Sequence, residues 1–302
     1  RLQGFLDLGR QVYTVDRLTL QRSAASYGGV ADVNGLEARI DSFRYASTGD
    51  LSLVVSQLAA NVHPAMEGVN PKYIIPIVET QARVQMDSAS VSIPRLSLKT
   101  DESCLQLAMQ MDLSAFDSIN PGRLAVDAQA HVGHGDVQSA VFGFLPEAEA
   151  RSLNTTLNQY LSRKPVQAVL KAEGNLQHLE VKTLDAFVEG FATLRSTAVL
   201  DHDRLSANAR LAALGSNIRL DADYDMAREA YKAKMAIRDL VVNKFVALDE
   251  RCAVNADLSA EGQGFDFLSR QTYLKARAAL PDAQYESFLR FARSYSDHLD
   301  LT

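Results

Sequence analysis

The sequence predicts a mainly β protein, a long and curled antiparallel sheet with an open groove and one or two short helices. Three observations support this fold class: apolar and polar residues alternate over many segments, the breaks between segments are short and turn-like, and helical patterns do not alternate with strand patterns. The third observation argues against strand–helix–strand units and a parallel sheet. At ordinary strand lengths the meander holds roughly sixteen to twenty strands, and an open sheet of that size must curl, split or close.

The alternation also predicts which side chains share one face of each strand. The clearest run contains Leu107, Met109 and Met111, and short breaks such as residues 47–50 and 214–217 separate the runs. Alternating strands usually bury a single side, so the apolar side is expected to line one concavity. The predicted groove-lining or core residues are Leu53, Val55, Leu107, Met109, Met111, Leu211, Ile218, Leu220, Met235 and Ile237.

Residues 146–163 break the strand pattern. Leu153, Leu157 and Leu161 recur at helical spacing, Glu147 lies in the first turn, and Pro165 ends the segment. We expect a helix that packs its apolar face against the sheet and plugs or covers part of the groove, because an isolated helix of this length is marginal in water. The expected division is a first β-groove unit over 1–145, the helix over 146–163, and a second unit over 164–302, with one continuous sheet.

The C-terminal segment carries a second helical pattern. It begins near Pro281 and continues through Phe288, Ala292, Tyr295 and Leu299. A strand around residue 289 fits the same residues, so both readings stay open.

Two stretches of the chain match each other at an offset of 128 or 129 residues. Residues 123–129 match 251–257, residues 107–109 match 235–237, and the glycines of 133–135 match those of 262–264. Several matches nearly in register predict a duplicated β unit, with the helix between the copies.

Composition excludes several classes of protein. The 302 residues include 37 acidic and 31 basic side chains, and the basic ones form no cluster of the kind that nucleic acid requires. Two cysteines cannot build a disulfide framework or a cysteine-rich zinc site. The longest stretch without a formal charge, 51–66, is shorter than a membrane-spanning helix. A start at Arg1 without a signal core is expected of a fragment or a processed form.

Residues 131–136 contain side chains that could form a metal or phosphate site, but their pattern is typical of a turn. His131, His134 and Asp136 fall in an expected solvated turn, which disfavours a metal site. The Gly133–Gly135 spacing lacks the third glycine and the following helix that phosphate binding requires, so it is also interpreted as a turn.

The remaining candidates point the same way. Asp221, Asp223 and Asp225 alternate as the wet side of a strand. Cys104 and Cys252 are expected to be free thiols on apolar strands, with a disulfide as the alternative. No nucleophile elbow or metalloprotease motif is present, so the sequence supports no enzyme and no cofactor.

Three segments resemble TamB proteins, the translocation and assembly module subunits of Gram-negative envelopes. They cover residues 96–105 (LSLKTDESCL), 172–179 (AEGNLQHL) and 260–266 (AEGQGFD), and the likeness extends over most of the chain, from near residue 15 to near residue 280. The order and spacing of these soft motifs carry the resemblance. TamB belongs with the AsmA-like and bridge-like proteins, which share long open β-grooves with apolar interiors.

The resemblance implies an internal, periplasmic segment of a cell-envelope protein that is anchored in the inner membrane. It implies phospholipid acyl chains as cargo, passage of lipid between membranes, and outer-membrane biogenesis with a barrel assembly partner. Two other classes of protein are alternatives. A carbohydrate-binding or carbohydrate-active β-solenoid would show a short repeat and aromatic platforms. A closed or membrane barrel would show aromatic girdles. The chain has no Trp and neither pattern.

Overall fold

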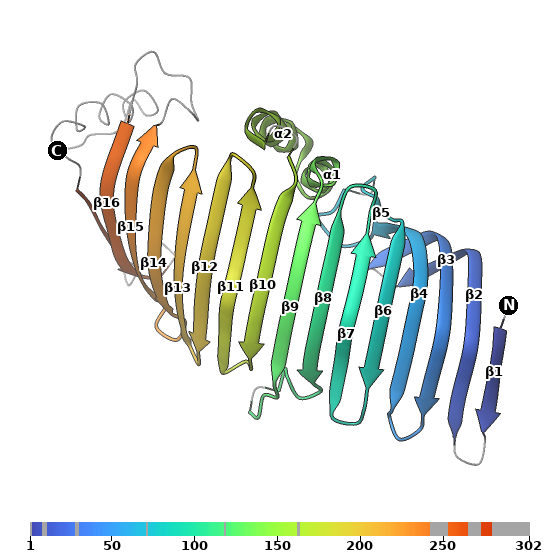
Figure 1. Cartoon of the computed structure of the whole chain (residues 1–302). Helices are drawn as coiled ribbons and strands as arrows, with labels where there is room; N and C mark the ends of the chain where they lie inside the picture. Colours follow the sequence, from blue (N-terminus) through green and yellow to red (C-terminus); the bar gives the residue numbers. More distant parts are fainter. Residues whose placement is uncertain are drawn as a thin grey trace. The chain divides into compact units, whose positions relative to one another are not determined.

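The computed structural model describes residues 2–7, 11–27, 30–70, 72–117, 119–161, 164–241, 253–264 and 273–279. The predicted fold class is confirmed: the protein is mainly β, and its strands form open antiparallel sheet with two short helices (Figure 1). Seventeen strands lie in the described residues, within the expected range. The chain divides into two compact units, Arg1–Leu176 and Gln177–Thr302.

The first unit is an antiparallel meander in which nearly every strand pairs with the next one along the chain. Strand β4 departs from this order, because it pairs with the short β5 and also with β6. The last two strands, β9 and β10, pair with each other although both helices intervene in sequence. The strands are β1 (Leu2–Asp7), β2 (Val12–Tyr27), β3 (Ala31–Ala46), β4 (Leu51–Pro64), β5 (Ile75–Ile77), β6 (Glu79–Met86), β7 (Ser90–Lys99), β8 (Cys104–Asp112), β9 (Leu124–Val132) and β10 (Val166–Gly174).

The second unit continues the same pattern of consecutive antiparallel hairpins. In the turn between β13 and β14, Leu214 and Gly215 both have positive φ, which matches the twist of the flanking strands. Antiparallel pairing is incompatible with the parallel rungs of a β-solenoid. The strands are β11 (His178–Val188), β12 (Ala192–Asp201), β13 (Arg204–Ala213), β14 (Ser216–Asp225), β15 (Ala230–Val241), β16 (Ala253–Gln263) and β17 (Tyr273–Ala279).

Both helices are inserted between β9 and β10 and lie beyond the ends of these strands (Figure 1). Helix α2 (Glu147–Leu161) falls inside the predicted 146–163 segment, whereas α1 (His134–Phe144) was not expected. The expected packing of α2 on the sheet is not observed, because its main neighbour is α1 and Leu153 stays 39% exposed. In the described part of the hairpin, Gly143 and Ala150 are buried, whereas Phe144 and Leu153 stay exposed.

Helix α1 is held at its C-terminal end by the connection between β4 and β5. The amide of Asn70 donates to the carbonyl of Gly143, with 2.7 Å between nitrogen and oxygen. Tyr73 packs edge-on against Phe144. A Cβ at Gly143 would lie 2.6 Å from Cγ of Tyr73, so this close approach requires glycine.

The duplicated unit predicted from the 128-residue offset is not preserved in strand register. Leu107 pairs with Ala128, whereas its match Met235 pairs with Leu258, two residues beyond the expected partner. A bulge at Asp239, which has positive φ, interrupts the pairing of β15 with β16. The matched glycines also differ, because Gly133 precedes α1 while Gly262 lies inside β16.

Among the described residues, no helix is long and apolar enough to cross a membrane. The helix or strand expected from residue 281 onward lies outside the described residues, and so does Cys252.

Candidate functional site

The first unit has an apolar face that can be followed from strand to strand. Directly paired residues of antiparallel strands project to the same side of the sheet. Two rows of paired residues cross the sheet from β4 to β10. One consists of Val55, Ala82, Leu96, Leu107, Ala128 and Leu170; the other consists of Leu51, Met86, Val91, Met111, Leu124 and Gly174.

The second unit has an equivalent apolar face. A row of paired residues crosses it from β12 to β16, and a second line on the same face, four residues away along each strand, consists of alanines alone. Because the alanine side chain is small, the surface of the sheet is lower along this line than along the row of leucine and isoleucine side chains. The row consists of Leu194, Leu211, Ile218, Ile237 and Ala256, and the line of Ala198, Ala207, Ala222, Ala233 and Ala260.

All ten predicted groove-lining residues lie on these two faces. Leu53, Val55, Leu107, Met109 and Met111 belong to the first unit, and the other five belong to the second. Each is half-buried, and none is fully exposed.

Sequence reasoning left out several residues of the same rows, notably Leu170 of β10 and Leu194 of β12. The alternation of Val166, Ala168 and Leu170 was visible in the sequence and could have identified β10. Ser196 interrupts the alternation of β12 and hides its apolar side.

The apolar faces lack a covering layer in the described part of the chain. The fully buried apolar residues there are small: six alanines and Val188. A sheet of an ordinary domain buries its apolar face against a second layer of helices or strands, and large side chains then become fully buried. Here leucine, isoleucine and methionine stay half-exposed, so the faces are available to an apolar ligand.

The opposite face of each sheet is polar. In the first unit, Gln106 of β8 and Gln129 of β9 are paired on it, and the neighbouring Asp127 forms an ion pair with Lys171. Cys104 carries a free thiol on the apolar strand β8, as expected, and is paired with His131 on this polar side.

In the second unit, three arginines, Arg195, Arg210 and Arg219, are directly paired across β12, β13 and β14 on the polar face. Arg219 contacts Asp221 at 3.1 Å from Nε to the carboxylate, in keeping with the expected wet side of β14. The two faces therefore differ sharply in chemistry.

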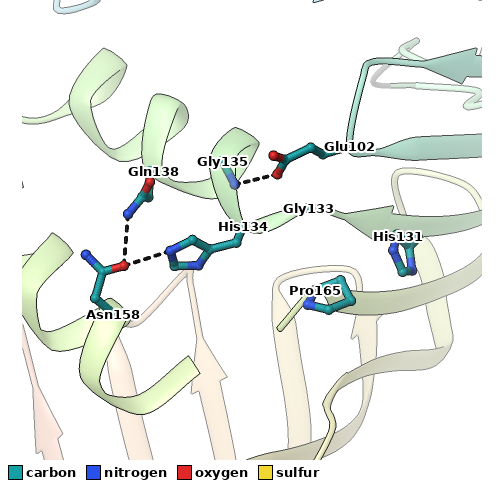
Figure 2. A pocket seen from close by; sticks show the side chains of 8 residues that line it. All are labelled: Glu102, His131, Gly133, His134, Gly135, Gln138, Asn158 and Pro165. Atoms are coloured by element: carbon teal, nitrogen blue, oxygen red, sulfur yellow. Dashed lines mark hydrogen bonds between the residues drawn. The ribbon is translucent and has the colours of Figure 1, made fainter. Parts of the chain in front are cut away.

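A polar cavity of about 910 Å³ lies where α1 begins, lined by residues of both helices, the β7–β8 turn and the ends of β9 and β10 (Figure 2). Nε2 of His134 lies 2.7 Å from Oδ1 of Asn158, which also accepts a hydrogen bond from Gln138. His131 lines the cavity too. In the described residues, no three groups of His, Cys, Asp or Glu are placed to hold a metal ion.

The prediction of a solvated turn at residues 131–136 is wrong, because His131 lies in β9 and α1 begins at His134. The first amides of α1 are capped by the preceding hairpin: Gly133 donates to Oγ of Ser103, and Gly135 donates to the carboxylate of Glu102. Asp136 in turn accepts hydrogen bonds from the hydroxyls of Thr100 and Ser103. The helix start is therefore already occupied by the chain's own carboxylate, which explains why the Gly133–Gly135 pair offers no phosphate cradle.

Comparison with protein-family models, curated proteins and solved structures finds no match to this chain.

Proposed function

We propose that the apolar faces of the two units bind the acyl chains of phospholipids, in a periplasmic segment of a TamB-like envelope protein. The observation that carries the proposal is the uncovered apolar face: rows of Leu, Ile, Val and Met cross many strands without a second layer in the described residues. Water against so large an apolar surface is unfavourable, and such surfaces ordinarily mark binding sites.

The chemistry of the faces favours acyl chains over headgroups. The rows contain no charged side chain that could recognise a phosphate or an amine, whereas each buried methylene contributes about 0.8 kcal/mol. Headgroups therefore stay in water at the margin of the sheet. Binding should depend on chain length and should discriminate little between headgroups.

The role suggested by the TamB resemblance is passage of phospholipid between the inner and outer membranes, assistance to the assembly of outer-membrane proteins, or both. A row of apolar side chains that continues from strand to strand suits passage, because a chain can move along it without meeting a charge. The same face suits assembly if it receives the apolar side of an unfolded barrel strand.

The test is native mass spectrometry of protein purified from cells. Met109→Asp places a charge on the apolar face, at a cost of several kcal/mol for any chain that covers it. Gln110→Asp is the matched control, because the neighbouring residue faces the polar side and is exposed. We expect wild type and Gln110→Asp to retain lipid and Met109→Asp to lose it. Equal occupancy in all three, or none in wild type, overturns the lipid proposal.

The second unit permits an independent repetition of this test. Ile237→Asp charges the row formed with Ile218 and Ala256. Lys234→Asp changes charge on the other side of the same strand and serves as its control. Loss of lipid in Ile237→Asp alone supports a binding face in the second unit as well.

A further inference from the structure

The connection between β8 and β9 presents the two most exposed large apolar side chains in the described part of the protein. Phe116 is 69% exposed and Ile119 is 78% exposed. Leu113, which begins the connection, is 50% exposed. Single exposed apolar residues are ordinary on protein surfaces, but here three lie within seven residues of one connection, and we refer to these three as the patch.

The described residues of this connection are ordered by their own hydrogen bonds. The carboxylate of Asp117 accepts from the amide of Ile119 at 2.8 Å and from the amide of Asn120 at 3.1 Å. The carboxylate of Asp112 accepts from the amide of Arg123 at 2.7 Å. Ala115 is 2% exposed and fixes the inner side of the connection. Because the backbone is ordered before any contact forms, little conformational entropy is lost when Phe116 and Ile119 dock.

Two carboxylates and one guanidinium lie in the same connection as the patch. The carboxylates of Asp112 and Asp117 are committed to backbone amides, and these bonds lower the pKa of Asp117. The exposed guanidinium of Arg123 forms no ion pair with any described residue. The connection thus carries exposed apolar side chains, two carboxylates that keep their negative charge while accepting amide hydrogen bonds, and one guanidinium without an ion pair among the described residues.

The patch is also continuous with the apolar face of the first unit. Leu113 follows Met111 at the period of the strand, and Met111 belongs to a row of that face. The apolar side of β8 therefore continues past the end of the strand, through Leu113, into the connection that contains Phe116.

We propose that this connection docks on a phospholipid bilayer, with Phe116 and Ile119 in the interfacial region and Arg123 at the lipid phosphates. The inference rests on the proposed function, because docking would bring the apolar face of the first unit next to a bilayer that supplies the phospholipid. A protein partner fits less well: a stable interface buries about 800 Å² on each side, far more than a connection of about ten residues provides. A bilayer needs only a few inserted apolar side chains with a nearby cation.

The absence of Trp from the sequence gives a direct probe. Phe116→Trp supplies the single indole of the protein, and its emission is measured with vesicles of phosphatidylethanolamine and phosphatidylglycerol. We expect a blue shift and quenching by brominated acyl chains. Phe187→Trp, at another exposed phenylalanine on β11, is the control and should show neither change. Unchanged emission from Trp at position 116 overturns the membrane assignment and leaves the patch to a protein partner.

A second experiment measures flotation with the same vesicles. Phe116→Ser combined with Ile119→Ser should lower the bound fraction at least tenfold. Met66→Ser combined with Ile74→Ser removes two other exposed apolar side chains and should leave it unchanged. Equal losses in the two double variants overturn the proposal. Met109→Asp separates this inference from the proposed function, because it should lose copurified lipid and still float.

Discussion

The carboxylate of Glu102 accepts a hydrogen bond from the amide of Gly135, with 2.7 Å between oxygen and nitrogen. Glu102 lies in the turn between β7 and β8, 33 residues before Gly135, yet it caps the first turn of α1. A negative charge at this position is favourable because helix N-termini carry unpaired amides and a positive end of the dipole. With the bonds of Gly133 and Asp136 to the same turn, this contact joins the start of α1 to the β7–β8 hairpin.

Removing the cap should destabilise the first unit. We expect Glu102→Ala to lower the free energy of unfolding by about 1 kcal/mol, the usual value of a helix cap, and to lower Tm by about 2–4 °C. Asp101→Ala is the control, because it removes the same charge from the neighbouring residue without touching α1. Differential scanning calorimetry gives both values. Equal effects of the two substitutions would show that charge, and not capping, sets the stability.

Removing the hydroxyl of Thr80 on β6 should raise the stability of the protein. The residue is 8% exposed and its Oγ1 has no hydrogen-bond partner among the described residues, which costs free energy in a buried site. Thr80→Val keeps the shape, and we expect it to raise the free energy of unfolding by about 1 kcal/mol in chemical denaturation. Ser216→Ala is the contrasting variant: its buried hydroxyl donates to the carbonyl of Asp239 at 3.0 Å, so the same kind of change should lower stability. A loss of stability in Thr80→Val contradicts this account.

The row of Arg195, Arg210 and Arg219 should be strained by its own charge. Like charges directly opposite each other on paired strands are destabilising by a few tenths to about 1 kcal/mol. Arg210→Gln should therefore raise Tm at low ionic strength, and the gain should shrink in concentrated salt, which screens exposed charges. Arg219→Gln removes one charge from the same row but also breaks the contact with Asp221, so its gain should be smaller. An increase in Tm for Arg210→Gln that is the same at low and high salt would contradict this prediction.

The phenol of Tyr73 should lose its proton at a higher pH than an ordinary tyrosine. Partial burial raises its pKa, and the negative charge of Asp136 raises it further. A raised pKa of an acid means that the folded state holds the proton more tightly than the unfolded state. The resulting stabilisation is complete below the ordinary tyrosine pKa near 10 and is lost as pH rises through the folded value.

Carbon NMR of labelled tyrosine follows this titration, and Tyr73→Phe assigns the signal. Asp136→Asn should bring the midpoint back toward the ordinary value. A midpoint for Tyr73 at or below that of the unfolded chain contradicts the prediction.

Local sequence patterns were enough to place many of the strands, the apolar side of each of these, and α2. Leu107, Met109 and Met111 could be placed on one side of β8 because side chains alternate along any strand, whatever it packs against. Helix α2 was visible for the same reason: its spacing, its acidic first turn and the following Pro165 are all local signals.

The tertiary structure decided the features that depend on distant partners. Helix α1 contains two glycines and a weak apolar pattern, and its start is capped by Glu102 and Ser103 from another hairpin. The bulge at Asp239 is fixed by Asn255 of the next strand, whose side chain accepts the Asp239 amide at 2.7 Å. The uncovered state of the apolar faces is likewise invisible in a pattern, because alternation says which side is apolar and only the packed chain shows what lies against it.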